Sequence, residues 1–497
     1  MRHDSEHDPK PGTFNLGEGT PIAGSLRLAG VRTAVELHSP EYFETRSSLG
    51  RFIKGQLANL TKVSLIDCIS AGTGTTSNPA EKCFHATVYP HFVVAGHQHL
   101  DPKADLISET SFLIDDATTL FYDFDAFGSV IDARPLIRQV VDANNLPRAI
   151  ETGEMPQIHY FTGKREIFFA ETAIGRISAF HSPSWALPSP NGLSIRNKIR
   201  TRIAFTEPIR FAESIDRILT VRELFGLLVG RPQNLSEILV VRTGENGEGE
   251  PLKVHWSRSP KRRSADGTER PHCADVLIDL VRNPIVGGRV MQSWIAREEK
   301  WRTPRSRFFS AFENRNYYTA ERLVAAANMF DVLPIDAVPS DVALSPELAE
   351  AKAEAQQSFR RLEQSQERDS VLSALGRIGR ASLKQKVRHR AQLVTNSLPQ
   401  KLPEITTILD MAVDCRNHLV HGSLAKLPSK SLDSIMYLLT DTLEFIFGAS
   451  DLVESGWEIT EWDSRTSTSH PFGRYLKTYI GILAHFKSVL RSAGGAA

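Results

Sequence analysis

The spacing of apolar residues changes near residue 300, and no single sheet or helix bundle can bury the apolar residues of both patterns. From Phe14 to about Asp116, and again over about 157–256, apolar residues alternate with polar ones or form short runs bounded by Gly, Pro and Asn, as in antiparallel strands. Beyond residue 300 they recur every three or four positions, as in amphipathic helices. The sequence therefore predicts an α+β multidomain chain with a strand-rich, antiparallel N-terminal domain and an all-α C-terminal domain.

The length of the chain agrees with this division, because 497 residues exceed what one hydrophobic core usually serves. We expect a flexible tail at 1–13, a strand-rich domain at 14–298, a helical domain at 299–492 and a flexible tail at 493–497. One amphipathic helix, 211–230, is expected to interrupt the strand domain and to stop at Gly230 and Pro232.

Six helices are predicted for the C-terminal domain, at 311–331, 345–368, 371–396, 403–421, 431–448 and 472–490. The second has the clearest start, because Ser345 suits the N-cap, Pro346 the first helical position and Glu347 the first turn.

The overall charge is balanced, with 59 Lys and Arg against 58 Asp and Glu, so any nucleic-acid surface must be local. One stretch of the third predicted helix contains cations and no acid: Arg377, Arg380, Lys384, Lys386, Arg388 and Arg390. Two interpretations stay open for it, an RNA-binding surface that contacts phosphates and a solvated face balanced by acids elsewhere. A second basic segment, 258–272, includes Arg262 and Arg263 and is expected to be a loop that contacts a partner or an RNA backbone.

The four cysteines, Cys68, Cys83, Cys273 and Cys415, lie far apart without a CxxC pair. This spacing favours reduced thiols over a disulfide or zinc framework and predicts a cytoplasmic protein. Apolar runs stay shorter than the ~18 residues that a membrane span needs, and the first residues lack the apolar part of a signal peptide, so no membrane partner is expected.

Two polar clusters contain residue types that bind metals. His97 and His99 could present two imidazoles on one strand face, but no third ligand is identifiable, and a pair of loop histidines explains them better. Acidic residues around TTLFYDFD are better explained by capping and solvation. The chain also lacks GxxxxGK[ST] and GxSxG sequences, so neither a metal nor another cofactor is expected.

The helix at 403–421 carries the most distinctive chemistry, in the segment RNHLVH. The spacing Arg-x4-His also occurs elsewhere in the chain, but Arg416, Asn417 and His421 form its single Arg-Asn-x3-His. Gly422 follows directly and suits the C-terminal cap of the helix. These three residues are the candidate catalytic group.

Helical geometry places Arg416 in the apolar stripe near Leu409 and Ala412, where an unpartnered guanidinium would be costly. A buried carboxylate, a groove open for a phosphate, or a second subunit could each compensate it. His421 lies about 140° further round, in the last turn, where the carbonyl end of the helix favours imidazolium. Because the two side chains diverge, we expect a homodimer through the helical domain to bring two such pairs together.

This segment resembles the HEPN superfamily, whose Arg-x4-6-His motif, often with Asn after the Arg, forms a metal-independent ribonuclease site at a dimer interface. Many members also have a supporting acidic residue in their first helix, and here ERLVAAANMFD offers Glu321 and Asn328 without distinguishing them. The N-terminal phrases GSLRLAG, VELH, KVSLIDC and FVVAGHQH resemble the strand domain of ApeA-type antiphage proteins, which precedes a HEPN domain.

The resemblance implies an α+β chain with a HEPN-like helical bundle and a metal-independent endoribonuclease of an antiphage, abortive-infection system. Its partners would be RNA, with tRNA as one candidate, a second copy of the chain, and a phage-derived trigger. The strand-rich domain would sense or restrain the nuclease. The alternative is a catalytically inactive HEPN module that serves dimerisation or RNA binding beside a ligand-sensing strand domain.

Overall fold

The computed structural model describes residues 8–17, 20–43, 51–144, 151–190, 192–243, 249–260, 271–313, 317–339, 344–463 and 469–494. The chain packs into two compact units. The first holds Met1–Phe225, Gln233–Arg262 and Asp279–Gly288, and the second holds Gly226–Pro232, Arg263–Ile278 and Arg289–Ala497. None of the helices in the described ranges is long and apolar enough to cross a membrane.

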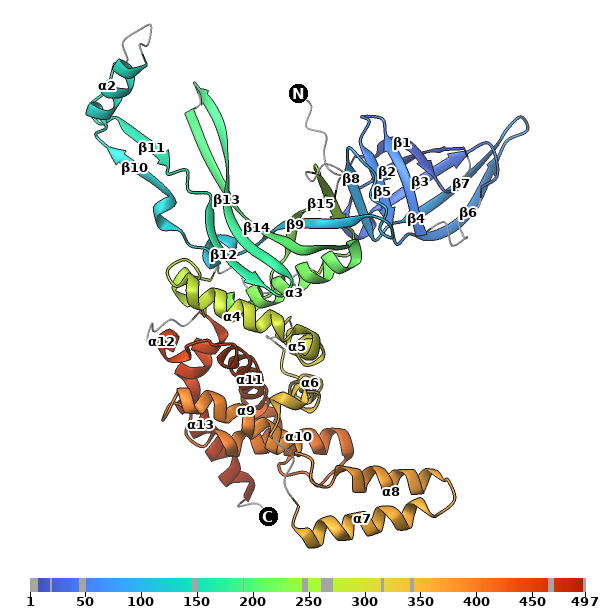
Figure 1. Cartoon of the computed structure of the whole chain (residues 1–497), viewed down its shortest axis with the longest axis vertical. Coiled ribbons are helices and arrows are strands. Elements are labelled where there is room, and N and C mark those ends of the chain that lie inside the picture. The colour runs from blue at the N-terminus through green and yellow to red at the C-terminus, as the bar shows by residue number, and fades with distance from the viewer. Residues whose placement is uncertain are drawn as a thin grey trace. The chain divides into compact units, whose positions relative to one another are not determined.

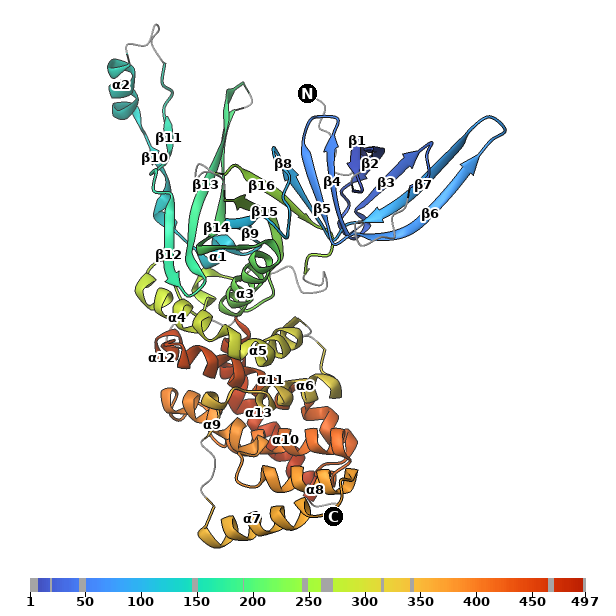
Figure 2. The same cartoon turned by 45° about the vertical axis from the view of Figure 1, so that its right-hand side comes forward.

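An antiparallel sheet of 14 strands, counted over the described residues, forms the first unit (Figure 1). Its spatial order is β12-β13-β14-β9-β15-β16-β8-β5-β4-β1-β2-β3-β7-β6. In chain order these strands are β1 Lys10–Asn15, β2 Ile22–Arg27, β3 Ala34–Ser39, β4 Phe52–Leu57, β5 Lys62–Ile66, β6 Ile69–Ser77, β7 Lys82–Tyr89, β8 Phe92–Gly96, β9 Leu106–Ile114, β12 Glu166–Thr172, β13 Gly175–Ser189, β14 Gly192–Arg210, β15 Leu235–Arg242 and β16 Pro251–Trp256. A separate pair, β10 Phe127–Ile131 and β11 Gln157–Phe161, forms an arm that carries α2 at its end (Figures 1 and 2).

The strands bury one face, as their alternation predicts. Along β4 the side chains switch regularly between buried and exposed, and the buried ones join a core that includes Phe14, Val35 and Leu65. Gly55 lies where a Cβ would come within 2.5 Å of the Phe14 ring, so only glycine lets the ring fill this position. The predicted antiparallel, strand-rich domain is confirmed.

Helices α1 Ala117–Leu120 and α2 Arg134–Ala143 lie wholly in the first unit, and α3 Phe211–Val229 and α4 Pro284–Ala296 lie partly in it. The long helix predicted at 211–230 is α3, and Gly230, with φ +88°, follows its last residue. Phe211 packs edge-on against Phe92 with ring centroids 5.3 Å apart, which anchors the start of α3 on the sheet. Since β1 starts at Lys10, the flexible tail expected at 1–13 is wrong for residues 10–13.

The C-terminal part of the chain is helical, as predicted. Its helices are α4 Pro284–Ala296, α5 Glu298–Glu313, α6 Ala320–Asp331, α7 Pro346–Arg360, α8 Gln366–Arg377, α9 Leu383–Ser397, α10 Ile405–His421, α11 Ser429–Glu454, α12 Ile459–Asp463 and α13 Pro471–Gly494. Short 3-10 turns occur at Gly30–Arg32, Phe124–Ala126, Cys273–Asp275 and Ile335–Ala337.

Several predicted helix boundaries are wrong, for local reasons. The helix predicted at 371–396 is two helices, because Gly379 has φ +88° and Ser382 starts α9 with a capping box. The one predicted at 311–331 combines the end of α5 with α6, which Thr319 caps. Helix α4 and most of α5 were missed, because Gly287 and Gly288 in α4 and Pro304 in α5 obscure the helical pattern. The start of α7 is confirmed, since the Ser345 side chain accepts from Leu348 N–H.

Helix α11 is the centre of the second unit. It is 26 residues long, its residues from Thr442 to Leu452 are all buried, and it packs against α5, α6, α9, α10 and α13. A helix that is apolar on nearly every side has no solvent face, so it must be enclosed by its neighbours.

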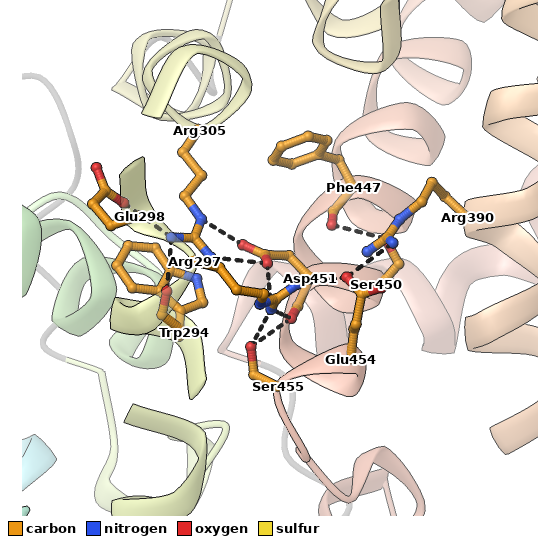
Figure 3. A network of polar contacts seen from close by, with 10 residues as sticks. All are labelled: Trp294, Arg297, Glu298, Arg305, Arg390, Phe447, Ser450, Asp451, Glu454 and Ser455. Carbon is orange, nitrogen blue, oxygen red and sulfur yellow. Dashed lines mark hydrogen bonds and ion pairs between the residues drawn. The ribbon is translucent and has the colours of Figure 1, made fainter. Parts of the chain in front are cut away.

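One charged residue of this central helix is buried among arginines (Figure 3). Asp451 is 2% exposed, and its carboxylate accepts from Arg305 Nε at 2.9 Å and Nη2 at 3.0 Å, and from Arg297 Nη2 at 2.8 Å. Arg305 itself is 1% exposed and also donates to Glu298 Oε2 at 2.9 Å. Burial alone would raise the pKa of Asp451, but the charges of Arg305 and Arg297 outweigh it and hold the pKa below its usual value.

A third arginine extends the network to α9. Arg390, 1% exposed, donates to Ser450 Oγ and to Glu454 Oε2, each at 3.0 Å. The guanidinium carbons of Arg297 and Arg390 lie 4.9 and 5.0 Å from the centre of the Trp301 ring. These contacts tie α5 and α9 to α11, and the charged groups of Asp451, Arg305 and Arg390 are shielded from water.

We expect Asp451→Asn to destabilise the second unit strongly, because it leaves buried guanidinium groups without a compensating charge. Breaking one partner of a buried ion pair typically costs about 3–5 kcal/mol. For a unit of this size that corresponds to a decrease of roughly 6–20 °C in Tm. Circular dichroism at 222 nm, which follows the helices during heating, measures this change.

Asp433→Asn is the matched control, since Asp433 is an exposed acid of the same helix. It should shift the free energy of unfolding by no more than about 0.5 kcal/mol. Equal Tm values for the two variants would contradict a structural role for the Asp451 charge.

Candidate functional site

Helix α10 carries the Arg-Asn-x3-His segment and is anchored by its apolar stripe. Ile405, Ile408, Leu409 and Ala412 are buried, as predicted. The helix ends at His421, and Gly422 adopts a left-handed φ of +65° as its C-cap, which confirms the predicted stop. The expectation for the start is wrong by two residues, because α10 begins at Ile405 after Glu404, a residue with φ +58°.

Arg416 is held mainly by α6. Its Nε and Nη2 donate to Asn328 Oδ1 at 3.0 and 2.7 Å, and Nη2 also donates to Asp331 Oδ2 at 3.1 Å. The arginine side chain is 12% exposed, whereas that of Asp331 is 43% exposed. Asn328 therefore fixes the guanidinium from the inner side, and Asp331 meets it at the surface.

The third guanidinium nitrogen of Arg416, Nη1, lies close to the histidine of the same motif. Arg416 Nη1 lies 3.1 Å from Asn417 Oδ1 and 3.1 Å from His421 Nε2. The expectation that Arg416 and His421 diverge, and need a second copy to meet, is wrong. The Cα positions do diverge on the helix, but the long arginine side chain bends toward the helix end.

This contact depends on the form of the imidazole. A guanidinium can only donate hydrogen bonds, so the two groups are hydrogen-bonded when His421 Nε2 accepts with its lone pair. That form is the neutral imidazole with its proton on Nδ1. His421 is exposed, so its ring is open to a ligand from solvent.

The structure decides which residue of the first helix supports the site. Asn328 contacts Arg416, whereas Glu321 lies in the exposed first turn of α6. Asp331, one turn after Asn328, is a further partner that the sequence analysis did not identify. Its position i+3 from Asn328, on the same helix face, was the available signal.

The remaining neighbours of the motif do not join the cluster. His418 turns its Nδ1 toward the Ser423 carbonyl at 2.6 Å. Cys415 is buried, and burial raises the pKa of its thiol to about 11, so a thiolate is disfavoured there. All four cysteines are free thiols, of which Cys68 and Cys415 are buried.

Family comparisons agree with both halves of this description. The sequence profile described as ApeA N-terminal domain 1 matches residues 10–294, which is more than half of the 497 residues. This chain belongs to the ApeA family. A second profile, Apea-like HEPN, matches residues 325–461, a range that contains Asn328, Asp331 and the α10 motif. The protein is thus of the HEPN-containing antiphage type, and the searches of curated proteins and of solved structures found no match.

The basic stretch of this ApeA-type chain is largely occupied by internal contacts. Arg390 is buried in the network around Asp451, so its assignment to a phosphate-binding surface is wrong. Lys384 pairs with Asp414 at 2.7 Å. Arg388 Nε donates to Asp410 Oδ1 at 2.8 Å.

The other three cations of this stretch differ from these. Lys386 Nζ donates to the Asp331 carbonyl at 2.8 Å and lies 4.0 Å from Asp331 Oδ1, which places a second cation beside the Arg416 cluster. Arg377 and Arg380 are exposed at the connection between α8 and α9, and an RNA contact stays a prediction for them.

The histidine pair of the strand unit includes one residue in a surface ion pair. His97 pairs with Glu250 at 3.3 Å on the surface, and over the described ranges no group of three or more His, Cys, Asp or Glu side chains has the arrangement of metal ligands. Arg262 and Arg263 of the predicted basic loop lie outside the described residues.

Apolar side chains surround the end of α10 on the solvent side. Leu419, Val420 and Leu424 are 38%, 45% and 86% exposed. Leu419 and Val420 belong to the last turn of α10, and Leu424 follows its C-cap. Exposed apolar residues grouped beside a functional site are typical of an interaction surface.

We expect neutral His421 to carry its proton on Nδ1, because Arg416 supplies the donor to Nε2. In full-length protein labelled with ¹⁵N-histidine, ring nitrogen spectra at pH 8 should show this tautomer for the signal that His421→Gln removes. Arg416→Ala should abolish the preference. A wild-type signal of the Nε2–H tautomer would contradict the contact.

Proposed function

We propose that this ApeA-type protein is a metal-independent endoribonuclease of an antiphage, abortive-infection system, with Arg416, Asn417 and His421 as its catalytic group. One observation carries the proposal: the guanidinium of Arg416 and the imidazole of His421 meet at 3.1 Å at the exposed end of α10. A permanent cation beside a proton acceptor is what phosphodiester transfer to an internal nucleophile requires.

RNA supplies that nucleophile itself, since the 2′-hydroxyl lies next to the scissile phosphate. His421 Nε2 has a single lone pair, so Arg416 Nη1 would first turn from it to the phosphate. Nε2 would then accept the proton of this hydroxyl, and the resulting imidazolium would be favoured at the carbonyl end of α10. Arg416 would stabilise the negative charge on the phosphorane, with two N–H groups on two phosphate oxygens. Asn417 would orient the guanidinium through its Oδ1.

The place of the phosphate is suggested by Asp331. Its carboxylate accepts from Arg416 Nη2 at 3.1 Å and is the partner of Arg416 that faces solvent. A phosphate oxygen approaching from solvent would replace it, and Lys386 would add a second positive charge there. Asn328, which is neutral and lies deeper, would keep the guanidinium in position during this exchange.

Partner choice is part of the same proposal. The helical unit would cut RNA, with tRNA as one candidate substrate, while the strand-rich unit would sense a phage-derived trigger and restrain cleavage until it arrives. The motif residues of α10 and their contacts in α6 all lie in the second unit, which supports this division.

Cleavage should leave a 2′,3′-cyclic phosphate, or the 3′-phosphate from its opening, and a 5′-hydroxyl. It should persist in EDTA and fail on RNA whose target 2′-hydroxyl is replaced by hydrogen, because the nucleophile is then missing. End-group analysis of the products of total cellular RNA measures this. Products with 5′-phosphate ends, or activity that is lost in EDTA and restored by Mg²⁺, would exclude the mechanism.

Variants connect these products to the site. His421→Ala should lower the cleavage rate by about 10²–10⁴, the usual contribution of general acid–base catalysis, while RNA affinity is retained. Arg416→Ala should weaken both. The matched control is His418→Ala, three residues away on α10 and directed elsewhere. Loss of activity in His418→Ala equal to that in His421→Ala would contradict the assignment.

A homodimer through the helical unit is the second part of the proposal. One chain offers His421 as proton acceptor, and cleavage also needs a proton donor for the departing 5′-oxygen. The partner's His421 would supply this proton if two copies met around a two-fold axis. The exposed Val420 and Leu424 provide an apolar surface for such a contact beside the site.

Light scattering of the full chain at micromolar concentration should therefore give the mass of a dimer, twice 55.3 kDa. Val420→Glu combined with Leu424→Glu should give a monomer, because it places charge in an apolar contact, and should lose cleavage although Arg416 and His421 are intact. A wild-type monomer that cleaves RNA would rule out the shared site.

A catalytically inactive RNA-binding or dimerisation module is the alternative, and one observation favours it. Each nitrogen of the Arg416 guanidinium already donates within the chain, so a phosphate must displace an existing partner. RNA binding that Arg416→Ala weakens, without cleavage under any condition that binds the trigger, would support this alternative.

A further inference from the structure

A pocket in the helical unit lies away from the Arg416 cluster. Its volume is about 210 Å³, and α5, α6, α11 and α13 form its walls together with the residues just before α6. Phe308, Phe312, Phe445 and Phe472 contribute buried aromatic rings. Such a volume is sufficient for one small aromatic molecule, since a cavity of roughly 150 Å³ accommodates benzene.

Two carboxylates and two arginines line this pocket: Glu444, Asp441, Arg322 and Arg474. Arg322 is 6% exposed and binds Glu444 with two parallel hydrogen bonds, each 2.8 Å long. This bidentate pair neutralises both groups. The charge of Asp441 is not compensated in this way. Among the described residues its nearest cationic nitrogen is Arg322 Nη2 at 3.9 Å, which already donates to Glu444.

Asp441 is therefore an incompletely compensated acid against an aromatic wall. Its carboxylate accepts from Tyr318 O–H at 2.9 Å, and its side chain is 34% exposed. Burial, followed by the charge of Glu444, raises the pKa of Asp441 to about 7, although Tyr318, Arg322 and Arg474 act in the opposite direction. The α5 side of the pocket contributes only Phe308 and Phe312.

We propose that this pocket binds a small organic cation with a planar amidinium or guanidinium head and an apolar body, the head on the Asp441 carboxylate and the body among the aromatic side chains. A planar cation can give two N–H donors to one carboxylate, and aromatic faces attract positive charge. An anion would meet Glu444 and Asp441, and a neutral molecule would leave Asp441 uncompensated.

The proposal is independent of RNA cleavage and can be tested by binding alone. Isothermal titration of the full chain with benzamidine should show saturable binding with a dissociation constant below about 1 mM. Benzamide, its neutral isostere, should bind at least about tenfold more weakly. Asp441→Asn should reduce the benzamidine affinity by a similar factor, whereas Asp433→Asn, an exposed acid on the same helix, should leave it unchanged.

The pH dependence gives a second measurement. With a pKa of about 7, the ionised fraction of Asp441 rises from roughly 9% at pH 6 to roughly 91% at pH 8, so affinity should increase about tenfold. Binding at pH 7 should release about half a proton, seen as a dependence of the heat on the ionisation enthalpy of the buffer. Asp441→Asn should abolish both effects. The Tm of the Asp441→Asn variant at pH 8 should equal or exceed that of the wild type. A carboxyl whose pKa is raised on folding makes the folded protein less stable as the pH rises toward 7.

A comparison of two probes identifies the natural source of the cation. Binding of benzamidine alone would indicate a free small molecule, and tighter binding of N-acetylarginine methylamide would indicate an arginine side chain of a protein. Four results would each overturn the proposal. They are equal affinity of benzamidine and benzamide, unchanged affinity in Asp441→Asn, equal affinity at pH 6 and pH 8, and tighter binding of guanosine than of either cation.

Discussion

Asp451 keeps a negative charge in a position that water does not reach, and arginines from other helices compensate it. Arg297 and Arg305 bind its carboxylate directly, and Arg390 binds Glu454, one turn further along α11. An apolar core of this size would tolerate small shifts between helices, but these hydrogen bonds form only in one register. The packing of α5 and α9 on α11 depends on this network, and so does the position of α6 and α10, which pack on α9 and α11.

The candidate site makes a different use of arginine. In the network around Asp451, full charges compensate buried guanidinium groups, whereas the inner partner of Arg416 is the neutral amide of Asn328. An amide can position a guanidinium without neutralising it, so the positive charge stays available to an anion from solvent. The only full negative charge bound to Arg416 among the described residues is Asp331, on the exposed side. Asn328 therefore positions the guanidinium, and Asp331 compensates its charge.

Much of the fold and part of the site could be predicted from the sequence because they depend on local patterns. Alternation predicts the strands, and the apolar stripe with Gly422 predicts α10 and its end. The contact of Arg416 with Asn328 and Asp331 joins positions 88 and 85 residues away, so one helix alone could not identify it. The burial of Arg390 depends likewise on Glu454 of another helix. Helical geometry predicted wrongly that Arg416 and His421 diverge, because it describes the directions of the Cα positions and ignores the length of the arginine side chain.

Helix α6 takes part in two unrelated polar clusters. Near its start, Arg322 binds Glu444, and near its end, Asn328 and Asp331 bind Arg416. The two clusters are six residues apart along one rigid helix, a rise of about 9 Å. Inserting or deleting a single residue between them would rotate one cluster about 100° relative to the other, and both could not then face their partners. During evolution this segment can change its side chains, but its length is fixed, and any regulatory insertion in the helical unit has to occur elsewhere.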